Sequence, residues 1–117
     1  MVEILFFGEG YDQMAEDKRK SELIGLFKNI DDSQRDLIKK LIDEVCFLED
    51  KMSELKKLPF ISVHPHKPAL QKTTAAAKLY KECSQSYMNA VRILLSVLNK
   101  TDVDAAEELK KRLEEFL

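Results

Sequence analysis

The chain has 117 residues, of which 44% are hydrophobic and 34% charged, which suits one folded domain and excludes a globally disordered protein. Its 21 acidic and 19 basic residues give a formal net charge of -2, which argues against a protein that coats nucleic acid as a monomer. A local basic patch repeated around an oligomer stays compatible with that charge. Only three glycines and three prolines interrupt the chain, so few, long helices are expected.

Residues 1–13 differ in character from the rest of the chain. An apolar run at residues 2–7 is broken by Gly8 and Gly10, and the sequence from Met14 onward resembles an ordinary protein start. Two interpretations are open: a locally packed N-terminal tail, or a non-native extension ahead of a start at Met14. The run is short and lacks a basic start, so it is a poor signal peptide. No apolar run approaches the roughly 18 residues of a membrane span.

An N-terminal helix is predicted within residues 14–30, with its end at Asn29. Its apolar residues recur at three- and four-residue spacing: Leu23, Leu26, Phe27 and Ile30. Gly25 weakens this helix by about 1 kcal/mol relative to alanine.

Residues 31–100 are predicted to form a long helical hairpin, around which the chain is organised. Its first helix begins at the capping sequence Asp31-Asp32-Ser33 and runs to about Lys57. Its apolar positions average a spacing close to 3.5, typical of a helix packed lengthwise against a partner. These positions are Leu37, Leu41, Val45, Leu48, Met52 and Leu55.

The bend at residues 59–68 contains Pro65 and Pro68, and the β-prone Phe60, Ile61 and Val63 allow a short extended piece. The second helix of the hairpin is predicted over residues 69–99, with Pro68 in its first turn. One face of this helix carries Leu70, Ala77, Tyr80, Tyr87, Val91, Leu94 and Leu98.

A C-terminal helix is predicted over residues 101–117, capped by Thr101 or Asp102. Its apolar side consists of Val103, Ala106, Leu109, Leu113 and Phe116.

The fold class expected from these elements is all-α: a long antiparallel helical hairpin with an N-terminal and a C-terminal helix. A bare pair of helices buries one face of each, yet both hairpin helices carry wider apolar arcs. Because soluble monomers rarely expose large apolar patches, we expect the hairpin to oligomerise. The alternative is a monomeric four-helix bundle in which the terminal helices complete the core.

The chain carries little that predicts catalysis. His64 and His66 provide two imidazoles, but no carboxylate or thiol stands near them in sequence to complete a metal site. No phosphate-binding glycine loop and no Glu-x-x-His motif occur. Cys46 and Cys83 are interpreted as reduced core thiols of a cytosolic protein. We therefore expect no enzyme activity, no cofactor and no metal.

Basic residues cluster near the start of the N-terminal helix and around the bend. They are candidates for contacts with DNA phosphates. The alternative is that they are solvated residues flanking the helices. These candidates are Lys18, Arg19, Lys20, Lys56, Lys57, Lys67 and Lys72.

Five segments together resemble the small terminase subunits of tailed phages, of the short, all-helical type. They are FKNID at residues 27–31, LIKKLIDEVCFL at 37–48, HKPA at 66–69, AAKLYK at 76–81 and AVRILL at 90–95. The resemblance covers about residues 18 to 98. The chain departs from many members of that family because it has no clear N-terminal DNA-binding domain.

The resemblance implies a non-enzymatic DNA-packaging protein of the bacterial host cytoplasm. Such proteins assemble into rings, recognise viral DNA and regulate the large terminase subunit. By this resemblance, the residues forming the ring or the hairpin core are Leu37, Leu41, Val45, Leu48, Leu55, Tyr80, Tyr87, Val91 and Leu94. The C-terminal helix, through Leu109, Leu113 and Phe116, is expected to dock the large subunit or the portal. The alternative is a helical oligomeric regulator or scaffold protein with no packaging role.

Overall fold

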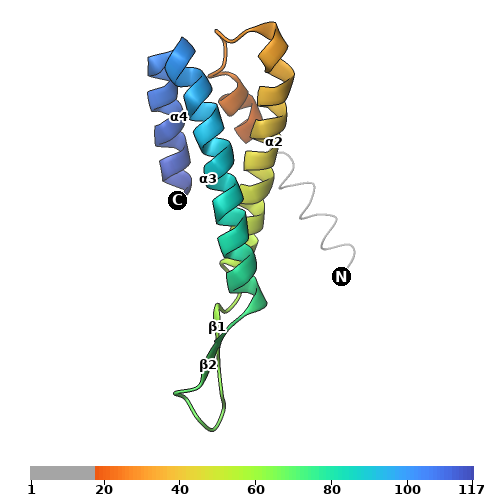
Figure 1. The fold of residues 1–117 in the computed structure, drawn as a ribbon, viewed down its shortest axis with the longest axis vertical. Helices are drawn as coiled ribbons and strands as arrows, with labels where there is room; N and C mark the ends of the chain where they lie inside the picture. The colour runs from red at the N-terminus through yellow and green to blue at the C-terminus, as the bar shows by residue number, and fades with distance from the viewer. Residues whose placement is uncertain (1–17) are drawn as a thin grey trace.

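The computed structural model describes residues 18–117, so both interpretations of residues 1–13 concern a segment outside the described chain. Residues 18–24 are helical and are followed by α2 (Asp32–Leu55), β1 (Ile61–Val63), β2 (Gln71–Thr73), α3 (Ala75–Thr101) and α4 (Val103–Phe116). The described chain is mostly helical, which confirms the all-α class. It is elongated, with extents of 60 × 35 × 22 Å (Figure 1). Within residues 18–117, no helix is both long and apolar enough to cross a membrane.

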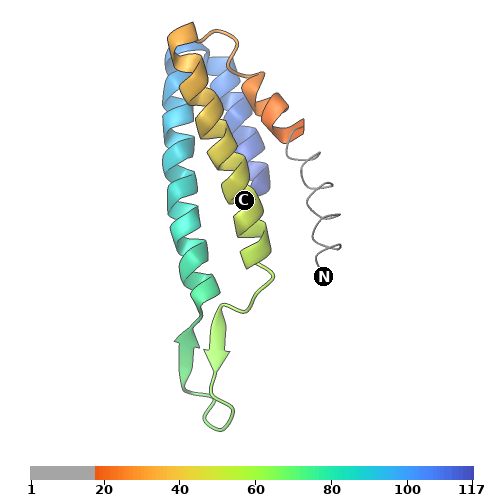
Figure 2. The same cartoon turned by 90° about the vertical axis from the view of Figure 1, so that its right-hand side faces the viewer.

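Helices α2 and α3 lie side by side and run in opposite directions, and α4 returns alongside α3 (Figures 1 and 2). Residues 18–24 and α4 lie on the same side of the α2–α3 pair, because they contact each other directly. Arg19 Nη2 donates to the carbonyl of Arg112 at 3.2 Å, and Arg112 forms a 3.0 Å ion pair with Glu22. No described element covers the opposite side of the pair, which we call the open face.

Two capping residues fix the ends of α3. The hydroxyl of Thr74 accepts a hydrogen bond from the amide of Ala77 at 3.2 Å and so caps the first turn. At the other end, Asp102 alone connects α3 to α4. Its amide donates to the carbonyl of Leu98, and its carboxylate accepts from the amide of Ala105 at 3.1 Å. Asp102 is thus the cap of α4, one of the two residues that the sequence predicted for that role.

Two predicted helix boundaries were wrong. The N-terminal helix ends at residue 24 rather than at Asn29, and tight turns replace it, such as the amide of Phe27 donating to the carbonyl of Ile24 at 3.0 Å. Gly25 lies where the helix stops, as its low helix propensity favours. Helix α3 begins at Ala75 rather than near residue 69, because residues 71–73 pair as a strand with residues 61–63.

The buried face of α2 is rotated from the predicted stripe. Ile38 and Ile42 are buried, whereas Leu37 is 57% exposed and Leu41 is only half-buried. The reason is that α2 packs against residues 18–24 as well as α3, which turns the centre of its buried arc toward Ile42 and Glu49. The remaining core comes from all the helical elements, including Leu23, Phe27, Val45, Met52, Tyr87, Leu94, Leu98 and Leu109.

Candidate nucleic-acid interface

A two-stranded antiparallel ribbon, β1–β2, projects beyond the end of the helical bundle (Figure 2). Its base is held in place by Thr74. The Thr74 hydroxyl donates to the carbonyl of Pro59 at 2.7 Å, and the Thr74 amide donates to the carbonyl of Phe60 at 3.1 Å. The ring of Phe60 packs on that of Tyr80, with centroids 5.3 Å apart. The ribbon is therefore anchored to the first turns of α3 and is not an isolated hairpin.

The loop at the tip of the ribbon is closed by His64. Its Nδ1 atom accepts hydrogen bonds from the amides of His66 and Lys67, each at 3.1 Å, while its own amide donates to the carbonyl of Leu70 at 3.0 Å. A nitrogen that accepts these bonds is not offered to a metal. Among residues 18–117, no three His, Cys, Asp or Glu side chains are grouped to hold a metal ion.

Charge is strongly segregated along the chain. Residues 55–81, which span the ribbon and both of its junctions with the helices, contain six lysines and no Asp or Glu. The rest of the chain carries all 21 acidic residues against 13 basic ones. In the described bundle, residues 18–54 and 82–117 carry 16 acidic and 13 basic residues. A basic projection therefore stands on a slightly acidic bundle, which favours contact with a polyanion at the projection.

This segregation was missed in the sequence interpretation because charge was summed over the whole chain. A count over a window of about 25 residues would have found it, since the acid-free stretch is continuous. The bulk net charge of -2 conceals it completely.

The ribbon is exposed on both faces. Every residue from 61 to 73 is exposed, including Ile61 at 57%, Val63 at 50% and Leu70 at 55%. Residues 62–65 and 70–72 line an open hollow of about 450 Å³. Exposed apolar side chains beside lysines distinguish this surface from an ordinary solvated turn.

Four of the predicted DNA-contact residues lie at the ribbon or its base. Lys57, Lys67 and Lys72 are exposed there. Lys56 is also exposed, and its Nζ lies 5.9 Å from the centroid of the Tyr80 ring and 5.6 Å from that of Phe116. The structure thus gathers these four lysines at one end of the molecule.

The other three predicted DNA-contact residues lie on the helical segment at residues 18–24, away from the ribbon (Figure 1). Lys18 is exposed, but Lys20 forms an ion pair with Asp43 at 3.4 Å. Arg19 differs from the other DNA-contact candidates, because its guanidinium is turned into the protein and paired with Glu49. The run of three basic residues in sequence therefore does not form one basic surface.

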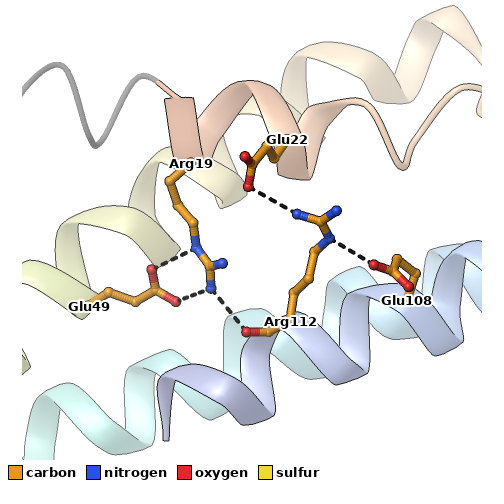
Figure 3. A network of polar contacts seen from close by, with 5 residues as sticks. All are labelled: Arg19, Glu22, Glu49, Glu108 and Arg112. Carbon is orange, nitrogen blue, oxygen red and sulfur yellow. Dashed lines mark hydrogen bonds and ion pairs between the residues drawn. The ribbon is translucent and has the colours of Figure 1, made fainter.

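Arg19 belongs to a polar network, and Figure 3 shows the part of it that joins residues 18–24, α2 and α4. Its Nη2 and Nε atoms donate to the two carboxylate oxygens of Glu49 at 3.0 and 3.3 Å. The Tyr87 hydroxyl donates to the same carboxylate at 2.8 Å. Nearby, Arg112 bonds to Glu22 at 3.0 Å and to Glu108 at 3.1 Å. Glu108 and Arg112 lie four residues apart on α4, so their ion pair runs along one side of that helix.

Burial and hydrogen bonding shift the pKa values in this network. Burial raises the pKa of Tyr87 above its ordinary value, and the hydrogen bond and negative charge of Glu49 raise it further. For Arg19, burial acts to lower the pKa, but the hydrogen bond to Glu49 and its charge outweigh that effect, so the net pKa is raised. The network thus holds a fixed charge pair and a neutral phenol, and it stabilises the packing of the elements.

The residues predicted for the hairpin core or a subunit interface separate into two groups. Val45, Leu48, Tyr87, Val91 and Leu94 are buried within the chain. Leu41, Leu55 and Tyr80 are half-buried, and Leu37 is largely exposed. Of these residues, only Leu37, Leu41, Leu55 and Tyr80 have enough exposed surface to contact a neighbouring molecule.

Side chains of the open face can be identified from the helical period. Ile93 lies two residues from Leu95, which lines a groove against α4, so Ile93 points away from α4. Leu41 likewise lies two residues from Asp43, which faces Lys20. Leu79 shares the side of Ile93, and these two are 49% and 48% exposed. Leu37 lies one helical turn before Leu41 on α2 and so shares its side. Apolar side chains are therefore spread along the open face: Leu37 and Leu41 on α2, and Leu79 and Ile93 about 21 Å apart along α3. We call these four residues the apolar strip.

Leu109, Leu113 and Phe116, which the sequence predicted to dock a partner, pack within this chain instead. Leu109 and Leu113 are 0% and 3% exposed, and the half-buried ring of Phe116 packs 5.6 Å from that of Tyr87. The apolar side of α4 is used to cover α3, so it offers no large surface to another protein.

Comparison with known proteins gives no relative: no family model matches the chain, and no curated protein or solved structure is significantly similar to it.

Proposed function

We propose that this chain is a small terminase subunit of a tailed phage, a non-catalytic oligomeric adaptor that contacts viral DNA and regulates the large terminase subunit. The observation that carries the proposal is the basic, acid-free ribbon projecting from a slightly acidic helical bundle. The resemblance of residues 18 to 98 to that family supports it. Exposed Lys57, Lys67 and Lys72 are the DNA contacts, with Lys56 at the base of the ribbon.

The adaptor assembles through the open face of the α2–α3 pair. Its strip is apolar: Leu37, Leu79 and Ile93 are exposed, and Leu41 is half-buried. Burying exposed leucine and isoleucine side chains between copies yields about 1.5–3 kcal/mol per fully buried side chain. A ring built this way carries the basic ribbon of every subunit, so weak phosphate contacts add through multivalency.

Light scattering tests the assembly. The parental chain is expected to have the mass of several subunits, and Ile93→Asp is expected to reduce that mass, because it places a charge in the strip without disturbing the buried core. Val103→Asp is the matched control, since Val103 is 62% exposed but lies on α4. A parental chain that stays monomeric at tens of micromolar overturns the assembly part of the proposal.

A second measurement tests the packaging role. If a large terminase subunit is encoded next to this chain, its ATPase activity is expected to change when the chain is added with DNA. Replacing both Lys67 and Lys72 by glutamine is expected to reduce this change. An assembled chain that neither binds DNA nor affects the large subunit would instead be a scaffold protein with no packaging role.

A further inference from the structure

The two faces of the β1–β2 ribbon differ in chemistry. Directly paired residues of antiparallel strands share a face. Ile61 pairs with Thr73 and Val63 with Gln71, and these alternate with the pair of Ser62 and Lys72. One face therefore presents methyl groups and a single amide, Gln71. We call it the methyl face. The other face carries the charged Lys72.

The methyl face has no packing partner among the described residues, because all thirteen residues from 61 to 73 are exposed. Two occupants are conceivable: the same face of a second copy, or the base edges of DNA. The surrounding charge decides between them. Six lysines and no acidic residue in residues 55–81 repel a second ribbon and attract a polyanion.

The dimensions and chemistry of the ribbon fit the major groove. The major groove of B-form DNA is about 12 Å wide and admits a two-stranded β-ribbon. Thymine displays a methyl group there, which apolar side chains contact, and adenine displays a donor–acceptor pair that a Gln amide matches with two hydrogen bonds. Ile61, Val63 and Thr73 supply the apolar contacts, and Gln71 supplies the amide. No Arg or Lys of the kind that reads guanine lies on this face.

We propose that the ribbon enters the major groove of double-stranded DNA with its methyl face against the bases and prefers A·T over G·C pairs. Lys67 and Lys72 contact the flanking phosphates, and Gln71 pairs with adenine. This inference rests on the proposed function, because it specifies how the basic ribbon meets DNA. It adds a sequence preference that phosphate contacts alone do not provide.

Fluorescence anisotropy with the full chain tests the inference, using an A·T-only and a G·C-only duplex of equal length at several salt concentrations. The chain is expected to bind the A·T duplex more tightly. Gln71→Ala is expected to weaken A·T binding by at least about 5-fold and to leave G·C binding unchanged. Gln85→Ala, at an exposed position of α3, is the matched control and leaves both affinities unchanged.

Two further measurements separate base reading from phosphate contact. Lys72→Gln is expected to weaken binding to both duplexes equally and to reduce the slope of log affinity against log salt by about 1. A duplex with 7-deazaadenine lacks the N7 acceptor but keeps the N6 donor, so the parental chain should lose affinity for it by no more than the factor that Gln71→Ala loses on normal DNA. Gln71→Ala should bind the two A·T duplexes equally.

The outcomes are distinguishable. If binding depends on Lys67 and Lys72 but not on base composition or Gln71, the ribbon meets phosphates only, and the groove inference falls while the proposed DNA contact stands. If neither lysine substitution affects binding to DNA, both fall. Because the altered residues are exposed on the ribbon, unchanged helical circular dichroism verifies that each variant keeps its bundle.

Discussion

The hydroxyl of Tyr87 on α3 donates a 2.8 Å hydrogen bond to Oε2 of Glu49 on α2, in a region where Tyr87 is 1% and Glu49 7% exposed. The same carboxylate binds the guanidinium of Arg19. A charged group in the core is costly unless it is paired and fully hydrogen-bonded. Glu49 therefore couples three helical elements: removing any one partner leaves a buried group unsatisfied.

Arg19→Met is expected to destabilise the fold by about 3 kcal/mol, because it leaves the Glu49 carboxylate buried without its cation. Urea unfolding followed by circular dichroism measures this loss. Arg35→Met is the control, since the Arg35–Asp32 ion pair is exposed on both sides and contributes less than about 1 kcal/mol. The triple variant Arg19→Met, Glu49→Leu, Tyr87→Phe should be more stable than Arg19→Met alone. A triple variant that is less stable would show that the network stabilises the fold in itself.

Stability is expected to fall at alkaline pH through Tyr87. Its pKa is raised in the folded state by burial and by Glu49, whereas the unfolded phenol ionises near the ordinary value of about 10. The folded state therefore keeps its proton after the unfolded state loses it. The contribution of the Tyr87 phenol to the free energy of unfolding is complete below about pH 10 and is lost as pH rises beyond that.

Absorbance at the phenolate band, followed during alkaline titration, measures this behaviour. The parental chain should show one late step that coincides with unfolding by circular dichroism, and Tyr87→Phe should lose it. Tyr80→Phe keeps the Tyr87 phenol and should retain the late step. A parental chain whose tyrosines all titrate before unfolding would contradict the assignment.

The sequence predicted the helices well because their signals are local. The apolar spacing located α2 and α3, and the carboxylate of Asp102 located the start of α4. It could not place the start of α3, since Pro68 also suits a first helical turn. The start of α3 is set instead by the pairing of Gln71 with Val63, a strand contact between residues that are not neighbours in the sequence.

The candidate site was predicted only in part, for a similar reason. The sequence identified Lys57, Lys67 and Lys72 as candidate DNA contacts, and the structure places them at the ribbon or its base. Arg19 was included among the candidates because a run of basic residues in the sequence usually indicates an exposed basic surface. Its partner Glu49 is thirty residues away, and nothing local shows that these two meet. Burial of Leu109 likewise depends on which face of α4 turns toward α3.

Leu109→Ala is expected to destabilise the fold by about 2–4 kcal/mol, because Leu109 is fully buried and the substitution leaves a cavity in the core. Urea unfolding again gives the free energy. Val103→Ala, at a 62% exposed position of the same helix, should change stability by less than about 0.5 kcal/mol. If Leu109→Ala leaves stability unchanged and instead abolishes binding to the large terminase subunit, α4 is a docking helix after all.

His64 is expected to hold the ribbon loop through its Nδ1 acceptor. His64→Leu removes the acceptor of the His66 and Lys67 amides, so the Lys67 amide should exchange its hydrogen about 5-fold faster, the effect of losing one hydrogen bond. His64→Asn should restore protection, because its side-chain carbonyl accepts bonds from amides two and three residues onward. Amide exchange measured by NMR gives both values.

His66→Leu is the matched control for this loop, since it removes an imidazole from the same exposed turn and keeps Nδ1 of His64. It should leave the Lys67 amide protected. Affinity for DNA should follow the same order, because a loosened loop no longer holds Lys67 beside the ribbon. Equal behaviour of the His64→Leu and His66→Leu variants would mean that Nδ1 of His64 does not hold the loop, and that the loop is held by the bond between the His64 amide and the carbonyl of Leu70.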